Sequence, residues 1–424
     1  MFDFLNNAKF RTTVVIVSRI LLGCVFVFSG FVKALDPYGF FYKQEEYLHN
    51  FGLDFLIPAA FVGAVLLAAV EFLLGICLLL GANIRSTSIF TILFMAFMTP
   101  LTLYIALFNP VSDCGCFGDA LIISNWATFW KNVVFSFLAV LIFLWRRYSP
   151  NLYSHRTEWL IALYCGFFSI ALSWYCYQNL PIIDFLPYKK GTDIVKSMEI
   201  PEGAPRAKYK TTLLYAKDGV TKEFTMEDYP KDDASWTFVD SKHEIVEKGY
   251  EPPIHDFTIS NNEIGEITDD VIHDPGYTFL LISSKIEQAS TNKRKEINAV
   301  YDFASKNGHK FYCLTSSGLE SKELKEYIIE TEAKYPFMNT DETTLKTMIR
   351  SNPGLMLIKK GIVINKWSNK NIPTFNKPLE ELKLHLRSNG RTVFYSFIVF
   401  VIPLLIILGM DRLVVFVRKR IKKE

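Results

Sequence analysis

Six long apolar stretches alternate with polar segments along the chain. Each approaches or exceeds the roughly 20 residues that a helix needs to cross the hydrocarbon core of a bilayer. They cover residues 14–32, 55–80, 89–108, 127–145, 159–177 and 393–410. The first stretch contains Arg19, ends near Lys33 and lacks a small-residue cleavage site, which predicts an uncleaved anchor. The pattern therefore predicts a multi-pass membrane protein.

Basic residues gather at alternate ends of these stretches, and short loops rich in Lys and Arg stay on the cytoplasmic side. If the six helices are threaded alternately, all four basic groups fall on one side. The groups are Lys9 with Arg11, Arg85, Arg146 and Arg147 with Arg156, and Arg418, Lys419 and Arg420 with Lys422 and Lys423. This threading predicts a multi-pass protein of the bacterial inner membrane, with both termini in the cytoplasm and residues 178–391 in the periplasm.

The segment between the fifth and sixth stretches is polar, with apolar residues at strand and helix spacing. Strands are expected at 277–283, 310–315, 354–359 and 362–367, helices at 292–305 and 321–335, and a closing helix after Pro378. The last two strands are joined by a turn at Lys360-Gly361. Upstream, strands at 211–216 and 221–224 flank Lys217-Asp218-Gly219, which predicts a hairpin. This segment is predicted to be a folded α/β module.

The expected fold class is an α-helical membrane bundle, a four-helix core plus two further spans, joined to a periplasmic α/β domain. The expected boundaries are 1–148 for the four-helix domain, 149–180 for the fifth helix, 181–250 for a β-rich segment, 251–390 for the α/β domain and 391–424 for the last helix and its basic tail. Half of the 424 residues are apolar, which excludes a single soluble domain. The net charge of +3 is too small to indicate nucleic-acid binding. The expected partners are the lipid bilayer and a periplasmic client or envelope protein.

Two cysteines one residue apart, Cys114 and Cys116, lie in the short loop between the third and fourth apolar stretches. A disulfide between them needs a tight bend, which Gly115 tolerates, and such a strained bond is oxidising and labile rather than structural. The first interpretation is a redox-active pair that accepts electrons from a client dithiol. The alternatives are a static staple and a metal site, and the metal site is disfavoured because the loop supplies two thiolates and no histidine.

Neighbouring charges refine this interpretation. Asp113 and Asp119 are expected to raise the pKa of the thiols by like-charge repulsion, which favours the oxidised form and an oxidant role. Cys176, at the outer end of the fifth stretch, is a candidate resolving thiol. Inside the membrane, Arg19 and Glu71 are expected at similar depth as an ion pair that either fixes helix docking or serves a proton- or cofactor-related role.

The first four stretches resemble the DoxX family and its methylamine-utilisation MauE branch over roughly residues 11–148. The resemblance rests on Ser18-Arg19-Ile20-Leu21-Leu22-Gly23, Phe28-Ser29-Gly30 with Lys33, Glu71 with Gly75 and Gly81, and Cys114-Gly115-Cys116-Phe117-Gly118. It implies a small membrane protein linked to thiol and disulfide metabolism, either an oxidoreductase or a helper for disulfide formation. The glycines are expected to permit close helix packing.

Residues 254–386 resemble the thioredoxin-like fold of periplasmic thiol reductases. Ser351-Asn352-Pro353-Gly354 stands where that fold places a cis-proline, and Asn352 and Pro353 would face a bound peptide. Where the family carries its cysteine pair, this chain reads Ser283-Ser284-Lys285-Ile286-Glu287-Gln288-Ala289-Ser290. The domain therefore cannot exchange dithiols by itself. Its single cysteine, Cys313, is expected in the core of a central strand.

An aromatic segment follows the first stretch, beginning at Asp36-Pro37 and containing Tyr38, Phe40, Phe41, Tyr42 and Tyr47. It is expected to be an external loop, either an interfacial belt or a lid over the cysteines. His49 in the same loop is a candidate base.

These observations favour a membrane thiol–disulfide oxidoreductase or disulfide-forming accessory that passes electrons to a membrane acceptor such as a quinone. The competing hypothesis is a non-enzymatic docking subunit of a cell-envelope complex. A transporter is disfavoured because the stretches offer few polar groups beyond Arg19 and Glu71.

Overall fold

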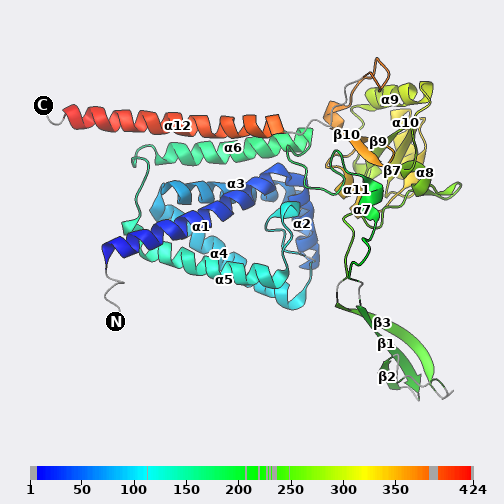
Figure 1. The fold of residues 1–424 in the computed structure, drawn as a ribbon, viewed down its shortest axis with the longest axis horizontal. Coiled ribbons are helices and arrows are strands. Elements are labelled where there is room, and N and C mark those ends of the chain that lie inside the picture. Colours follow the sequence, from blue (N-terminus) through cyan, green and yellow to red (C-terminus); the bar gives the residue numbers. More distant parts are fainter. Residues whose placement is uncertain are drawn as a thin grey trace.

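The computed structural model describes residues 7–421 except 112, 206–207, 218–219, 226–227, 229–230, 232–235, 248 and 382–389. Within this part of the chain, six helices are long and apolar enough to cross a membrane, which confirms the predicted multi-pass architecture (Figure 1). They are α1 (Ala8–Leu35), α3 (Ile57–Leu80), α4 (Ile84–Phe108), α5 (Asn125–Leu144), α6 (Glu158–Asn179) and α12 (Gly390–Ile421). Each covers one predicted stretch to within two residues at either end.

Helices α1 and α3 pack closely in the membrane bundle because glycines line their contact. A Cβ on Gly30 would lie 2.4 Å from the backbone nitrogen of Phe72, and one on Gly75 would lie 2.5 Å from that of Val27. The predicted packing role of these two glycines is therefore confirmed. Gly81 has a different role from these two glycines. It is the C-cap of α3, where its φ of +72° lies in the left-handed region.

The aromatic segment is a helix, α2 (Pro37–Asn50), so the prediction that it forms a loop is wrong. Its start signals are present in the sequence. Asp36 is the N-cap and accepts a hydrogen bond from the backbone nitrogen of Gly39, and Pro37 occupies the first helical position. The helix lies at the end of the bundle next to the α/β domain (Figure 1).

The α/β domain contains a seven-stranded sheet in the order β10-β9-β6-β7-β8-β4-β5. Its strands are β4 (Ser260–Asn261), β5 (Gly265–Glu266), β6 (Tyr277–Ser283), β7 (Lys310–Thr315), β8 (Phe337–Asn339), β9 (Gly354–Lys359) and β10 (Ile362–Ser368). Strands β6, β7 and β8 are parallel, whereas β9 runs antiparallel to β6 and to β10. Lys360 and Gly361 both have positive φ, as a two-residue hairpin turn of type I′ requires.

Helices cover both faces of this sheet. Alternate residues of β6 enter two separate cores, with Leu280 and Ile282 in one and Phe279 and Leu281 in the other. The first core is closed by α7 (Ile194–Met198), α8 (Thr268–Ile272) and α11 (Glu342–Met348), and the second by α9 (Arg294–Lys306). Helix α10 (Lys322–Thr331) packs on a smaller cluster with Ile286.

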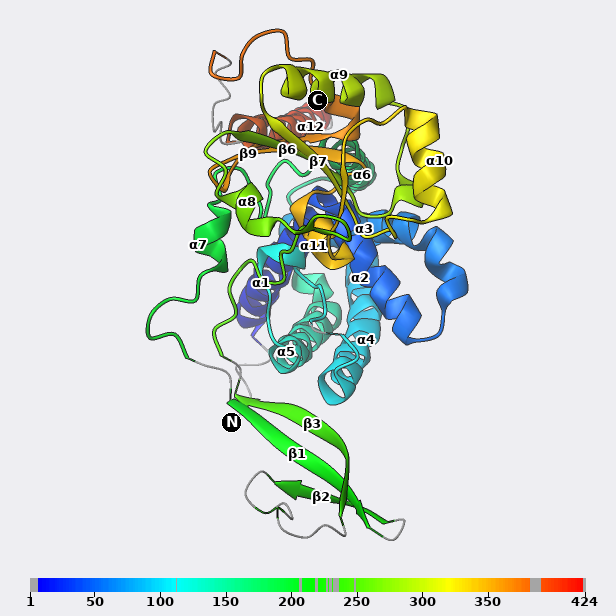
Figure 2. The ribbon, with the colours of Figure 1, turned by 90° about the vertical axis from the view of Figure 1, so that its right-hand side faces the viewer.

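A second sheet, in the order β2-β1-β3, projects away from the rest of the chain (Figure 2). It consists of β1 (Lys208–Lys217), β2 (Val220–Thr225) and β3 (Thr237–Glu247). The predicted hairpin is confirmed as the antiparallel β1–β2 pair, but its turn residues Asp218 and Gly219 lie outside the described residues, and β3 was not predicted. The predicted helix after Pro378 falls largely on 382–389, which also lie outside the described residues.

Candidate functional site

The Cys-Gly-Cys loop joins α4 to α5 at the end of the bundle beside α2 and is closely packed. Cys114 and Cys116 are each 8% exposed and lie in an apolar cluster with Ile105, Val111 and Phe117. The loop is bounded by Asn109, which ends α4, and Ser124, which caps α5 by accepting a hydrogen bond from the nitrogen of Ala127. The two sulfur atoms are therefore largely shielded from solvent.

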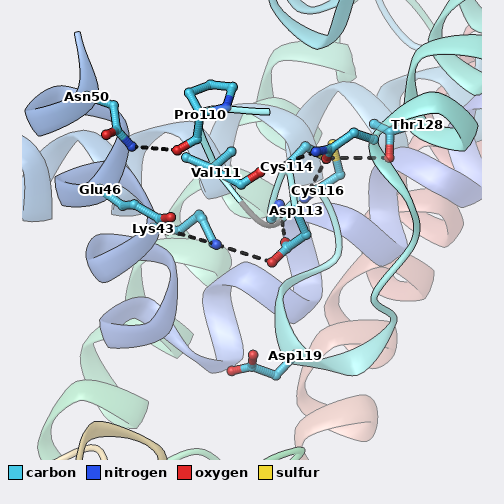
Figure 3. A network of polar contacts seen from close by, with 12 residues as sticks. Lys43, Glu46, Asn50, Pro110, Val111, Asp113, Cys114, Cys116, Asp119 and Thr128 are labelled. Atoms are coloured by element: carbon cyan, nitrogen blue, oxygen red, sulfur yellow. Dashed lines mark hydrogen bonds and ion pairs between the residues drawn. The ribbon is translucent and has the colours of Figure 1, made fainter. Parts of the chain in front are cut away.

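The bend between the cysteines depends on Gly115, which has φ +63°. A Cβ at this position would also lie 2.7 Å from Cγ of Lys43, so both backbone conformation and space favour glycine. The nitrogen of Gly115 donates to Oδ1 of Asp113 at 2.7 Å, and the nitrogen of Cys116 donates to Sγ of Cys114 at 3.3 Å (Figure 3). The loop thus turns the backbone of one cysteine toward the sulfur of the other.

Both cysteines are free thiols in this structure, and each shifts the pKa of the other. The pKa of Cys114 is lowered to about 6, chiefly because the Cys116 side chain donates a hydrogen bond to its sulfur, with further help from the Cys116 backbone and the charge of Lys131. The pKa of Cys116 is raised, first by that same shared hydrogen bond and then by burial. The pair therefore favours a thiolate on Cys114 over one on Cys116.

This electrostatic result corrects the expected effect of the two aspartates. Asp113 pairs with Lys43 at 3.2 Å, and Asp119 pairs with Arg350 at 2.7 Å. Because each carboxylate faces a cation, neither dominates the thiols, and the pKa of Cys114 is lowered rather than raised.

A buried ion pair lies beneath the loop, but it is not the predicted one. Lys33 Nζ lies 2.6 Å from Oε1 of Glu71, and both side chains are at most 3% exposed. Ser29 Oγ lies 2.6 Å from both Oε2 of Glu71 and the carbonyl oxygen of Cys116. This polar cluster therefore touches the backbone of the cysteine loop from the membrane side.

The predicted Arg19–Glu71 pair is wrong because of the register between α1 and α3. Arg19 donates instead to the carbonyl oxygen of Leu78 at 2.7 Å, near the C-terminal end of α3, and to Ser149 Oγ at 2.6 Å. Fourteen residues separate Arg19 from Lys33, which is about 21 Å along a helix. Glu71 can therefore pair with only one of these cations.

Three further residues surround the sulfur atoms and were not predicted as site residues. Thr128 Oγ1 lies 3.7 Å from Sγ of Cys114, and Lys131 Nζ lies 4.3 Å from the centre of the Phe117 ring. The buried hydroxyl of Tyr47 has no hydrogen-bond partner among the described residues. The pKa of Tyr47 is raised by burial and then by the charges of the two cysteines, so its hydroxyl stays protonated beside them.

The α/β domain contacts the loop through Arg350. Its guanidinium binds Asp36 through Nε at 2.9 and 3.1 Å and Asp119 through Nη2 at 2.7 Å, and its side chain is 6% exposed. Arg350 follows α11, which lies on the side of the domain that faces the bundle (Figure 1). The Asn352–Pro353 peptide bond comes two residues later and is cis, as predicted.

The other candidate residues lie elsewhere. Cys176 is 1% exposed and packs with Leu35 and Leu172, in a different cluster from Cys114 and Cys116, so its placement does not support a resolving role. Cys313 is fully buried on β7, as expected, and burial raises its pKa. His49 pairs with Asp54 at 2.9 Å on the surface.

Asn352 links its own loop to the end of β6 and the segment that follows it. Ser283 Oγ donates to Oδ1 of Asn352 at 2.7 Å, and Nδ2 of Asn352 donates to the carbonyl oxygen of Lys285 at 2.8 Å. In the part of the chain that the structure describes, no group of three or more His, Cys, Asp or Glu side chains is arranged to hold a metal ion.

Comparisons with known proteins find similarity to two families and to one solved structure, each over part of the chain. Residues 209–248, which include β2, match a family described as a domain of unknown function (DUF8463). No curated protein matches the chain. The chain is also similar to a solution structure from Bacteroides thetaiotaomicron described as a protein disulfide isomerase, with 16% identity over 28% of this chain and 77% of the other, and a TM-score of 0.23. A TM-score this low supports no inference about fold or activity.

The remaining match covers the membrane helices that carry the cysteine loop. It extends over residues 11–146, about a third of the chain, and includes Ser29, Lys33, Glu71, Cys114 and Cys116. This N-terminal part, with its buried ion pair and Cys-Gly-Cys loop, is thus similar to the family described as methylamine utilisation protein MauE.

Proposed function

We propose that this protein is a membrane thiol–disulfide oxidoreductase whose Cys114–Cys116 pair accepts electrons from the dithiol of an extracytoplasmic client. The proposal rests on the bend at Gly115, which brings the backbone nitrogen of Cys116 to 3.3 Å from Sγ of Cys114. It is supported by the opposite shifts of the two thiols, since the pKa of Cys114 is lowered and that of Cys116 is raised. Stabilisation of a thiolate favours the reduced form, which makes the corresponding disulfide a stronger oxidant. The pair is therefore still proposed to act as an oxidant, because the Cys114 thiolate is stabilised and not because the aspartates raise the pKa of the thiols.

The exchange takes two steps. A client thiolate attacks Sγ of Cys114 in the Cys114–Cys116 disulfide, which forms a mixed disulfide and releases Cys116 to take up a proton. The second client thiolate then attacks the client sulfur, which closes the client disulfide and releases Cys114 as a thiolate. The pair gains two electrons, and turnover requires a two-electron acceptor in the membrane, for which a quinone has suitable chemistry.

The α/β domain would position the client. Its strand order β10-β9-β6-β7, with the helix α9 between β6 and β7 and a cis-proline before β9, supports a thioredoxin-like fold. Such a fold without its own cysteines can still bind an extended peptide beside the cis-proline. Because Arg350 docks this loop region near the cysteine loop, a client held at Asn352 and Pro353 would be tethered close to Cys114.

Trapping experiments test this function. In the C116S variant, the Cys114 thiolate should attack the disulfide of an oxidised client, which is the reverse of the second step, and displace one client thiolate. Because Cys116 is absent and cannot resolve the mixed disulfide, the covalent complex should accumulate in native membranes and disappear on reduction. The C114S variant should yield much less of this complex. The control is C24S, since Cys24 is an exposed residue on the membrane helix α1.

The competing function is a docking subunit in which the cysteine loop is structural. The burial of both sulfur atoms favours this alternative. If maleimide labelling after acid quenching finds Cys114 and Cys116 always oxidised, and neither serine variant traps a client, the oxidoreductase proposal fails and the docking function replaces it.

A further inference from the structure

A cavity of about 520 Å³ opens where the last turn of α6, the first turn of α12 and the chain entering the α/β domain meet. It is lined by residues of the 175–190 segment, by Lys366 of β10 and by Gly390, Thr392 and Val393. Its volume lies in the range of small-molecule sites. The cavity is distant in the chain from the cysteine loop and has no part in the proposed exchange.

Among the described residues that line the cavity, the charged side chains are three lysines and one aspartate, which leaves a net positive charge. Lys366 Nζ pairs with Oδ2 of Asp184 at 2.7 Å, and the Lys366 side chain is 3% exposed. Lys189 and Lys190 line the same cavity, and the described residues give neither an ion-pair partner. The pKa of Lys190 is lowered by burial and then by the charge of Lys366, while the charge of Asp184 opposes this shift. The cavity therefore favours an anion.

A second cavity of about 460 Å³ continues from the first along the groove between α6 and α12. The two share Tyr175, Ile182 and Thr392 as wall residues. The groove itself is apolar, with Phe167, Phe168, Ala171, Leu172 and Val399 among its wall residues. Since α6 and α12 are both membrane-spanning helices, hydrocarbon chains of the bilayer are the molecules with direct access to it.

A cationic cavity at one end of an apolar intramembrane groove matches an anionic amphiphile. We propose that an anionic phospholipid of the leaflet next to the α/β domain binds here, with its phosphate between Lys189 and Lys190 and one acyl chain in the groove between α6 and α12. Basic pockets between transmembrane helices are known to bind anionic headgroups. The bound lipid fills the groove beside α12, whose contact with α6 includes Tyr164 Oη donating to the carbonyl oxygen of Val399 at 2.6 Å.

Lipid binding to the full-length, delipidated protein in detergent tests the proposal. Native mass spectrometry should show one phosphatidylglycerol retained per chain at concentrations where phosphatidylcholine is not retained. In the double variant K189Q/K190Q, phosphatidylglycerol affinity should fall about 30-fold, which corresponds to about 2 kcal/mol at about 1 kcal/mol for each lysine near a membrane surface. The matched control is K196Q, which removes an exposed lysine that pairs with Asp193 on α7.

A variant that fills the groove between α6 and α12 tests separately whether an acyl chain binds there. The variant A171W places an indole on the groove wall and should also reduce phosphatidylglycerol retention while leaving both lysines in place. Equal retention of phosphatidylcholine, unchanged binding in K189Q/K190Q, or unchanged binding in A171W would each overturn the proposal. Inorganic phosphate that competes as strongly as the lipid would assign the cavity to a soluble anion instead. None of these results depends on Cys114 or Cys116.

Discussion

Replacing Arg350 by methionine should detach the α/β domain from the cysteine loop. The guanidinium forms two hydrogen bonds with Asp36, whose side chain is 14% exposed, and one with Asp119, whose side chain is 42% exposed. Removing one partner of a buried pair costs about 3–5 kcal/mol because the other charge stays buried and unpaired. In R350M, Asp36 keeps its hydrogen bond from the nitrogen of Gly39, so we expect a cost at the lower end of this range of about 3–5 kcal/mol. The half-exposed Asp119 adds under about 1 kcal/mol.

We therefore expect a docking free-energy loss of about 3 kcal/mol, equivalent to a change of more than about 100-fold in the docking equilibrium. Hydrogen–deuterium exchange of the full chain in nanodiscs measures it, with peptides covering the N-terminal turn of α2 and the α11–β9 loop. Exchange should accelerate in both segments of R350M. The control K325M removes an exposed lysine of α10 in the same domain and should leave both segments unchanged.

A double-mutant cycle separates this ion pair from general destabilisation. In D36N the amide retains an oxygen acceptor for the α2 N-cap while losing the charge. The combined variant D36N/R350M should be less perturbed than the sum of the two single variants, because it leaves no unpaired buried carboxylate at Asp36. Additive effects, or exchange in R350M that differs from the native protein by less than threefold, would refute the ion-pair reasoning.

Two further predictions concern the charged groups of the bundle. The rate of iodoacetamide modification of Cys114, followed by mass spectrometry, should rise with pH around a midpoint of about 6, because the thiolate is the reactive form. The variant C116A removes the main hydrogen-bond donor and should raise the midpoint, whereas a native midpoint of 8 or above would contradict the lowered pKa of Cys114. K33M should lower the thermal unfolding midpoint, because it leaves the buried Glu71 carboxylate without its cation at a cost of about 3–5 kcal/mol. The double variant K33M/E71L should recover most of this lost stability. The effects of R19L and E71L on stability should be additive, because Arg19 and Glu71 are not partners.

The parts of the fold that were predicted correctly are those whose signal is local. Strand 277–283 coincides with β6 and 310–315 with β7, because runs of buried β-formers are bounded by polar residues in the sequence. The membrane helices follow from apolar length alone. Helix α2 was missed although Asp36 and Pro37 provide its start signals, because its aromatic residues were interpreted as an interfacial loop.

The ion-pair partners of the charged residues could be identified only from the tertiary structure. Arg350 and Asp36 are 314 residues apart in the chain, and Arg350 and Asp119 are 231 apart, so no periodicity relates them. The choice between Arg19 and Lys33 as partner of Glu71 depends on the register of α1 against α3, which is set where Gly30 and Gly75 allow close contact.

The sequence by itself determined that the chain spans a membrane, that it carries an α/β domain without a cysteine pair, and that Gly115 permits a bend between Cys114 and Cys116. These properties depend on hydrophobic length, short-range periodicity and the conformation of single residues. Only the tertiary structure decided in which direction the pKa of each cysteine is shifted, which cation neutralises each carboxylate, and which domain contacts the loop. Those outcomes depend on distances of a few ångströms between groups far apart in the chain, because electrostatic interactions and hydrogen bonds respond to spatial separation rather than to sequence separation.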